Sequence, residues 1–298
     1  MLDIKYIRDH VEAVRENIRV RQASADLDLL IRLDDERSVL MKDVEHRRRE
    51  RNEVAERVST TSAAERPVLI EQGKFLKEQI ASQERRLDEV TALWTTEMMR
   101  LPNLTHPDAP VGATDADNVP LHQSGTIAKL SFSPQSHVQL AERHDLIDFV
   151  RGAKVAGAKF YFLKGKLVLL EQALVQWVLH LAAAEGFIPM TTPDLAKDEV
   201  LVGAGFQPRG PEAQIYSVQD TDLSLIGTAE IPLGGYHKDE ILEEDQLPLK
   251  YVGLSHCFRT EAGTYGRESY GLYRVHQFTK VELFVFAGAW QSEAIHEQ

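Results

Sequence analysis

Apolar side chains in the first hundred residues recur at alternating steps of four and three, which is the spacing of a heptad repeat. One such run extends from Leu33 to Val58 and a second from Leu69 to Trp94. A repeat of this length predicts two long helices, each with one apolar stripe that packs against a partner. Few other folds accommodate so regular a pattern over so many residues.

The connection between the two repeats is short and polar, from Ser59 to Pro67. Pro67 suits the first turn of a following helix, where its missing N–H has no partner to lose. Because a short connection joins them, the two helices should form an antiparallel hairpin. We therefore predict a helical coiled-coil arm over residues 1–105, with little core of its own.

Basic residues cluster part-way along the first repeat, at Arg47, Arg48, Arg49 and Arg51, with Lys42 nearby. Two of them, Arg47 and Arg51, occupy positions in the heptad stripe where apolar residues would stabilise more. Either the cluster is a solvated helix face that pairs with neighbouring acids, or it contacts phosphates. The local sequence leaves both readings open. The neighbouring acids are Glu45, Glu50 and Glu53.

Charge and cysteine content limit the partners and the compartment. The net charge is −12, of which the first hundred residues contribute only −2. RNA binding by the arm is therefore compatible with the acidic total. The single cysteine, Cys257, excludes an internal disulfide framework and a multi-cysteine zinc site. We expect a reducing, cytoplasmic setting.

Prolines, glycines and asparagines crowd the segment from Leu101 to Gly125, which indicates a linker over residues 106–125. Beyond it, a strong helical pattern extends from Gly165 to Gly186, and short β-type runs occur at Lys250–Leu254 and Val281–Phe286. Polar turns separate the β-type runs, so residues 126–298 are predicted to form an α+β domain with an antiparallel sheet.

Two patterns resemble common signatures without fulfilling them. Residues 152–159 read G-x-x-x-x-G-A-K, but a P-loop needs lysine directly after the glycine and a hydroxyl next. The apolar stretch from Leu167 to Phe187 contains polar residues that include Glu171, Gln172, Gln176 and His180, so a buried or interfacial helix is favoured over a membrane span.

Three stretches carry candidate chemistry. Residues 186–193 read G-F-I-P-M-T-T-P, a helix end followed by a strand. Residues 225–230 read L-I-G-T-A-E, in which Thr228 and Glu230 either bind a small amine or begin a helix. Residues 258–263 and 273–282 suggest two antiparallel strands. On them, Arg259 can neutralise a phosphate or carboxylate, Phe278 can stack on a base, and Glu282 can receive an ammonium group.

Together and in this order, the three stretches closely resemble seryl-tRNA synthetases, which are class II ATP-dependent ligases. Residues 186–193 resemble the end of class II motif 1, and the T-A-E at 228–230 resembles the family's serine-binding segment. F-R-T-E-A-G at 258–263, with R-V-H-Q-F-T-K-V-E at 274–282, resembles motif 2. The N-terminal hairpin resembles the family's tRNA-binding arm.

The resemblance implies that serine attacks the α-phosphate of ATP and is then transferred to tRNA(Ser). Arg259 would be the catalytic residue, and it would bridge the serine carboxylate and the α-phosphate. Serine binding would fall to Thr228, Ala229, Glu230, Arg259 and Glu282. ATP binding would fall to Arg259, Thr260, Glu261, Val275, Phe278 and Glu282.

Further expectations follow from the resemblance. Glu261 would contact the adenine amino group and Phe278 would stack under the ring, with Val275 lining that pocket. Magnesium would bridge the phosphates of ATP, with no metal site on the protein itself. The arm would grip tRNA through Arg47, Arg48, Arg49 and Arg51, and the motif 1 region would form a homodimer.

The chain ends at Gln298, before the family's motif 3, so we expect a C-terminally truncated, incomplete catalytic domain with little or no activity. The alternative is a non-catalytic paralogue that acts as an RNA-binding module. The presence of Arg259, Glu261 and Glu282 argues against this alternative, because a site that had lost its function should have lost some of them. A ligase that charges a carrier protein would lack the arm, and a purely structural coiled coil would leave two thirds of the chain unexplained.

Overall fold

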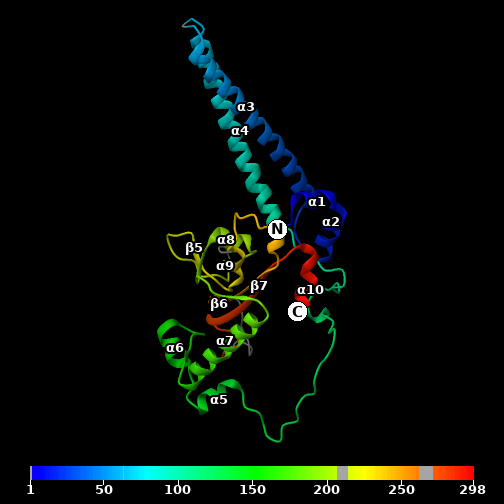
Figure 1. Ribbon diagram of the computed structural model, residues 1–298, viewed down its shortest axis with the longest axis vertical. Helices are drawn as coiled ribbons and strands as arrows, with labels where there is room; N and C mark the ends of the chain where they lie inside the picture. Colours follow the sequence, from blue (N-terminus) through cyan, green and yellow to red (C-terminus); the bar gives the residue numbers. More distant parts are fainter. Residues whose placement is uncertain (1, 63, 207–213, 262–270) are drawn as a thin grey trace. The chain divides into compact units, whose positions relative to one another are not determined.

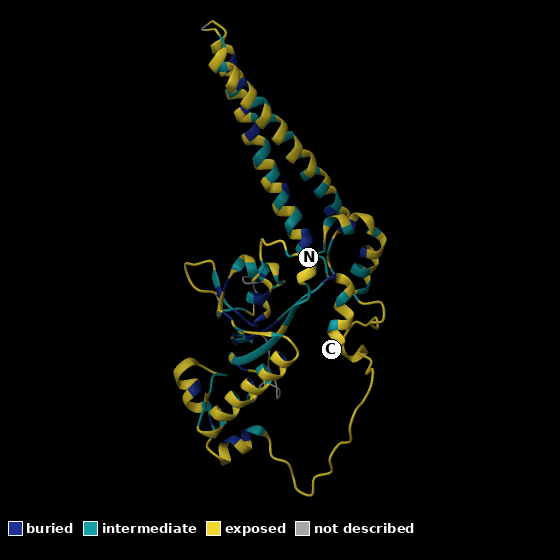
Figure 2. Cartoon of the chain, in the orientation of Figure 1, coloured by how far each residue is buried: buried dark blue, intermediate teal, exposed yellow. Residues whose placement is uncertain are grey.

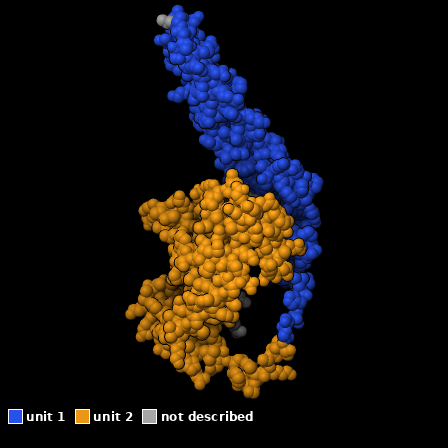
Figure 3. Space-filling view, viewed as in Figure 1, with its two compact units in different colours: residues 1–125 blue, residues 126–298 orange. Residues whose placement is uncertain are grey.

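A computed structural model describes residues 2–62, 64–206, 214–261 and 271–298 (Figure 1). The chain divides into two compact units, residues 1–125 and residues 126–298, coloured separately in Figure 3. The first unit ends at Gly125, the last residue of the segment whose prolines and glycines indicated a linker.

The first unit is dominated by two helices that lie side by side, α3 (Leu27–Thr60) and α4 (Arg66–Arg100) (Figure 1). They confirm the predicted arm, and Pro67 lies in the first turn of α4 as expected. Most of the apolar residues predicted for the stripe are buried between the helices, and the others, among them Val58 and Trp94, are partly buried (Figure 2). The buried stripe consists of Leu33, Val44 and Val54 in α3 with Leu69, Leu76, Ile80 and Val90 in α4.

Two hydrophobic clusters hold this unit together. Near the tip of the hairpin, Val54 packs with Leu69 and Leu76. At its base, two short helices, α1 (Ile4–Asp9) and α2 (Val11–Val20), contribute to a second cluster. The buried members of this base cluster are Ile7, Val14, Leu27, Leu30 and Met98.

After α4 the chain forms only a 3₁₀ turn, η1 (Asp115–Asp117), before the helices of the second unit begin. The remaining helices and strands are as follows: α5 (His137–Arg143), β1 (Ile147–Asp148), α6 (Phe149–Ala156), β2 (Phe162–Leu163), α7 (Lys166–Ala184), β3 (Ile188–Thr191), β4 (Leu195–Lys197), α8 (Asp198–Gly203), β5 (Leu223–Leu225), α9 (Glu230–Gly234), η2 (Glu244–Gln246), β6 (Leu249–Phe258), β7 (Gln277–Phe286), η4 (Ala289–Gln291) and α10 (Ser292–Glu297).

The main sheet of the second unit has the strand order β3-β6-β7. The long strands β6 and β7 pair antiparallel, from Leu249 opposite Phe286 to Phe258 opposite Gln277, as predicted. The sheet departs from the predicted antiparallel pairing at β3, which pairs parallel to β6. A parallel pair needs a long crossover, and the segment containing α8 and α9 between β3 and β6 supplies it.

Helix α7 is long and apolar enough to cross a membrane, judged by length and composition alone. Within the chain only Val175 and Ala182 of this helix are buried, and its surface is largely exposed (Figure 2). Leu169, Leu174 and Trp177 are each more than half exposed. The helix therefore presents an apolar face that the second unit does not cover. Of the two predictions for this stretch, an interfacial helix fits this exposure better than a buried helix.

The near-match to a P-loop is not a loop. Gly152, its first glycine, lies inside α6. A Cβ atom at Gly152 would approach the backbone carbonyl oxygen of Phe160 to 2.4 Å. Close packing of the helix on the following segment therefore accounts for this glycine without a bound phosphate.

Candidate active site

The site is built on one face of the β6–β7 pair. Because side chains alternate along a strand, Phe278, Lys280 and Glu282 of β7 share a face. Gly253 of β6 lies directly opposite Glu282. A Cβ atom at Gly253 would come within 2.9 Å of Leu233 Cδ1 and 3.1 Å of the Ala229 Cβ. Glycine at this position therefore allows α9 and the residues before it to pack closely on the sheet.

Thr228 reaches this face from the segment between β5 and α9. That segment is anchored by the Phe258 N–H, which donates a 2.8 Å hydrogen bond to the carbonyl oxygen of Ile226. The Thr228 side chain is almost fully buried, and its hydroxyl donates a 2.6 Å hydrogen bond to Glu282 Oε2. Thr228 Oγ1 also accepts a 3.2 Å hydrogen bond from the backbone N–H of Glu230, the first residue of α9. The Thr228 hydroxyl thus bonds to the first residue of α9 and also faces the carboxylate, and amine binding by this segment stays a prediction.

Lys280 completes the cluster. Its Nζ donates a 2.9 Å hydrogen bond to Thr228 Oγ1 and forms an ion pair with the Glu282 carboxylate. A carboxylate, a hydroxyl and an ammonium group therefore meet at one point of the sheet. Because Thr228 and Glu282 both bind an ammonium here, they form a subsite with the chemistry of amine recognition.

Arg259 lies just beyond the end of β6, and its side chain is held in two ways. Its Nε and Nη2 donate hydrogen bonds of 3.4 and 3.3 Å to the carbonyl oxygen of Gly227. Its guanidinium carbon lies 5.1 Å from the centre of the Phe278 ring, a cation–π contact. Arg259 thus places a positive charge between the Thr228 segment and the aromatic ring predicted to hold the adenine.

The other residues predicted for ATP binding lie on either side of the segment 262–270. Glu261, whose side chain is largely buried, accepts a 3.3 Å hydrogen bond from Arg274. Thr260 donates a 3.3 Å bond to the Gln214 side chain, and Val275 is buried. The end of the predicted F-R-T-E-A-G stretch, at 262 and 263, lies outside the described residues.

Two residues predicted to bind serine stand apart from this cluster. Ala229 is fully buried and packs with Leu233 and Tyr251, so its methyl group belongs to the core. Glu230 is exposed and lines a separate depression of about 370 Å³, together with Val200 and Lys238. The T-A-E segment therefore brings only its threonine to the Glu282 carboxylate.

Three side chains that the sequence did not single out support the site. Besides Lys280, they are His276 and Tyr216. The Nδ1 atom of His276 lies 2.8 Å from the Arg259 carbonyl oxygen and 2.9 Å from the Tyr216 hydroxyl, and the ring stacks on Phe160. The two-residue period between Phe278 and Glu282 was a signal for Lys280. No local pattern indicated Tyr216, which lies 60 residues from His276.

Cys257 lies opposite Phe278 in the same strand pair and is fully buried. Burial raises the pKa of its thiol, because the charged thiolate is poorly solvated there. A neutral, buried thiol is a poor nucleophile. Cys257 therefore packs on the same face of the strand pair as Phe278, beside the site.

On the arm, the predicted basic cluster is largely paired within the hairpin. Arg48 forms a 2.6 Å ion pair with Glu84 of α4, and Arg49 pairs with Glu45 at 3.3 Å. Arg47 bonds to Asp43 and also reaches Gln79 across the hairpin. The expected pairing with neighbouring acids is thus found for Arg49, whereas Arg48 pairs with an acid of the other helix.

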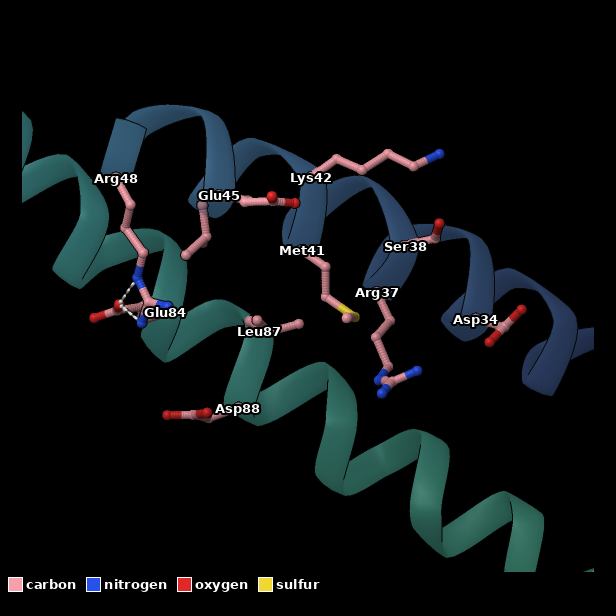
Figure 4. Close-up of a pocket in the computed structure, with 11 residues that line it drawn as sticks. Asp34, Arg37, Ser38, Met41, Lys42, Glu45, Arg48, Glu84, Leu87 and Asp88 are labelled. Atoms are coloured by element: carbon pink, nitrogen blue, oxygen red, sulfur yellow. Dashed lines mark hydrogen bonds and ion pairs between the residues drawn. The ribbon is translucent and has the colours of Figure 1, made fainter. Parts of the chain in front are cut away.

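A depression of about 740 Å³ lies beside this cluster, between α3 and α4 (Figure 4). Arg37 and Met41 point from α3 toward α4, and Leu87 faces them from α4, while Lys42 extends outward. Arg37 stacks on the Trp94 ring at 4.9 Å. Charges of both signs line the depression, so its surface is amphoteric rather than uniformly basic.

Comparisons with known proteins cover the whole chain. Residues 1–105 match the seryl-tRNA synthetase N-terminal domain, and residues 215–297 match the tRNA synthetase class II core domain (G, H, P, S and T). The serine–tRNA ligases of Treponema denticola and Rubrobacter xylanophilus are 48% and 50% identical over 100% of the chain, which covers 71% and 70% of their lengths.

Solved structures agree with the sequence matches. The crystal structure of seryl-tRNA synthetase from Pyrococcus horikoshii complexed with ATP superposes with a TM-score of 0.81 at 35% identity. The chain is covered completely and spans 72% of that structure. The cytoplasmic serine–tRNA ligase of Naegleria fowleri in complex with AMP superposes with a TM-score of 0.75 at 25% identity.

Proposed function

Because the chain belongs to the seryl-tRNA synthetase family, we propose that it activates L-serine with ATP to seryl-adenylate and transfers the seryl group to tRNA(Ser). The observation that carries this proposal is the Thr228–Glu282 pair, which already binds an ammonium group, with Arg259 nearby. An amino acid offers the matching charges, an ammonium for the pair and a carboxylate for the arginine.

In the first step the serine carboxylate attacks the α-phosphorus of ATP and pyrophosphate leaves. Such a reaction needs positioning and charge neutralisation rather than a protein nucleophile. Arg259 neutralises the carboxylate and the α-phosphate as they approach. Phe278 offers its ring to the adenine, and Glu261, held by Arg274, accepts from the adenine amino group.

Selection of serine over alanine rests on the substrate hydroxyl. A pocket that hydrogen-bonds this hydroxyl through Glu282 rejects alanine, because the carboxylate then loses a partner. Thr228 and Glu282 are the residues to which we assign the ammonium and hydroxyl of serine. Glu230 is exposed and lines a separate depression, so we assign it a contact with serine through a bridging water.

We propose that magnesium enters this site bound to the phosphates of ATP. Among residues 2–62, 64–206, 214–261 and 271–298, no group of three or more His, Cys, Asp or Glu is placed to hold a metal ion. The nearest carboxylates, Glu261 and Glu282, are paired with Arg274 and Lys280. When bound, Mg²⁺ would neutralise phosphate charge, with ATP supplying most of its ligands.

The arm gives the protein a surface for tRNA. We assign its phosphate contacts to Arg47, Arg48, Arg49 and Arg51, of which Arg48 and Arg49 are more than half exposed despite their ion pairs. Surface pairs of this kind contribute only about 0–1 kcal/mol, so a phosphate can replace the carboxylate at little cost.

Self-association is the third part of the proposal. The apolar face of α7, which includes Leu169, Leu174 and Trp177, is the surface to which we assign a homodimer. Burying such a face against a second copy removes apolar area from water. A dimeric, cytoplasmic enzyme is the form we propose.

The test is ATP–pyrophosphate exchange with serine, threonine and alanine, measured on the 298-residue chain and on the full product of its gene. Serine-dependent exchange with little response to alanine supports the proposal. A folded gene product that binds tRNA(Ser) but supports no exchange would instead favour a non-catalytic RNA-binding module.

A further inference from the structure

We propose that the ammonium group of Lys280 fills the amine subsite of the serine pocket in the ligand-free protein, and that the substrate ammonium must displace it. The inference rests on the proposed function, since it concerns the pocket assigned there to serine. It gives a role to a residue for which sequence reasoning offered none.

The geometry carries the inference. Thr228 Oγ1 lies 2.6 Å from Glu282 Oε2, and Lys280 Nζ lies 2.9 Å from the same hydroxyl while pairing with the same carboxylate. The three groups form a closed triangle. Thr228 and Glu282 are therefore already satisfied by a primary ammonium, which is the functional group that an amino acid brings.

Charge makes the two ammonium groups competitors. Glu282 supplies one negative charge, and Arg259, which lies over the Phe278 ring on this face, is positive. A substrate ammonium beside Lys280 would meet a like charge within a few ångströms, in a site partly shielded from water. Occupation by the substrate therefore requires Lys280 to leave.

Lys280 is able to leave. Its side chain is about one third exposed, and its charge is carried on a flexible four-carbon stem that can extend into solvent. The Thr228 hydroxyl is buried and fixed by the Glu230 N–H, so it stays behind. The pocket is thus held in its binding geometry before serine arrives, at the cost of a weaker affinity for serine.

A further consequence is selectivity for amines. A compound without an ammonium group cannot replace Lys280 at Glu282. For example, 3-hydroxypropionate, which is serine without its amine, would bind with Lys280 still in place. Removing the lysine charge should then strengthen the binding of serine while leaving the binding of 3-hydroxypropionate little changed.

Isothermal titration calorimetry on the intact protein tests this, with L-serine and 3-hydroxypropionate as ligands. Lys280→Met keeps the length of the side chain and removes the charge; Lys280→Arg keeps the charge. We expect Lys280→Met to bind serine several-fold more tightly than the unsubstituted protein, and Lys280→Arg to show no such gain. Lys250→Met, on β6 and outside the cluster, is the matched control and should change neither ligand.

If Lys280→Met binds serine no more tightly than the unsubstituted protein, the inference is wrong and Lys280 merely orients Glu282. If no protein in the series binds serine, the proposed function fails as well. The experiment therefore distinguishes failure of the Lys280 inference from failure of the proposed function. A second measurement uses the unsubstituted protein and so does not depend on the folding of a variant. In protein labelled with ¹⁵N-lysine, the hydrogen-bonded Lys280 ammonium signal should disappear when serine binds, and its persistence would overturn the displacement.

Discussion

The Thr228 hydroxyl donates a 2.6 Å hydrogen bond to the Glu282 carboxylate, joining two residues that lie 54 positions apart. Neither residue is placed by its own local sequence. Strand β7 carries the carboxylate, and the close approach of α9 over Gly253 brings the hydroxyl to it.

Thr228→Val removes the hydroxyl at nearly constant volume. A hydrogen bond to a charged group contributes about 1.5–3 kcal/mol, so serine affinity should fall by roughly 10- to 100-fold. The KM for serine in pyrophosphate exchange measures it. Thr228→Ser restores the hydroxyl and should recover most of the affinity; equal losses in both variants would contradict the role assigned to the hydroxyl.

Gly253→Ala should destabilise the second unit by about 1–3 kcal/mol, because the new methyl group would collide with Leu233 and Ala229. Gly227→Ala is the matched control. Its Cβ would meet no atom closer than 3.5 Å, so its unfolding free energy should remain close to that of the unsubstituted protein. Urea denaturation of both variants gives the comparison, and equal stabilities would contradict the close packing of α9.

Trp177→Glu, on the exposed face of α7, should weaken self-association and leave the folded chain intact. The Trp177 side chain is 60% exposed, so the substitution buries no charge within the chain. Sedimentation velocity over a range of concentrations measures the change. Leu104→Glu, at an exposed apolar residue of the first unit, is the control. An unaltered dimer in the Trp177 variant would exclude this face as the interface.

Replacing Arg48 and Arg49 together by alanine should weaken tRNA(Ser) binding and flatten its dependence on salt. Each lost phosphate contact lowers the slope of log K against log salt by about 0.7–0.9. Filter binding at several salt concentrations measures both effects. Arg19→Ala, an exposed arginine of α2 paired with Glu16, should leave them unchanged. A weaker complex with an unchanged slope would indicate that the arginines act through the shape of the arm.

Alkaline pH should destabilise the second unit through Cys257. Burial raises the pKa of its thiol above the ordinary value of 9.0, so the folded state holds the proton more tightly than the unfolded state. The stabilisation is present below about pH 9 and is lost as pH rises through the folded pKa. Chemical denaturation between about pH 8 and 10 should show a fall that Cys257→Ala lacks. Above that window the buried phenols, including Tyr251, contribute as well, because burial also raises their pKa.

The sequence predicted those features that local periodicity determines. The heptad stripe was read correctly from Leu33 to Trp94, because each position depends only on neighbours three or four residues away. The β6–β7 pair followed from two apolar runs. The parallel pairing of β3 was missed, since nothing within the residues 188–191 indicates the direction of their partner.

In the candidate site, too, local sequence predicted some residues and long-range contacts determined the others. Arg259, Phe278 and Glu282 came from resemblance to a known motif. The structure places Phe278 and Arg259 at one end of the β6–β7 pair and Glu282 near its middle. The separation of Glu230 from Thr228 arises because α9 begins between them, and one helical step turns the side chain away from the sheet. The bond between Lys280 and Thr228 and the contact between Tyr216 and His276 each join residues more than 50 positions apart, so no local pattern predicts them.

The two apolar clusters of the arm have a consequence for the order in which it folds. Val54 and Leu69 close a loop of only about fifteen residues, whereas Leu30 and Met98 close one more than four times as long. The entropy lost on closing a loop grows with its length. The hairpin should therefore begin to fold at its tip and extend toward its base, so that the cluster around Val54 forms before the cluster around Leu30. Amide exchange during refolding would record protection at Val54 before protection at Leu30.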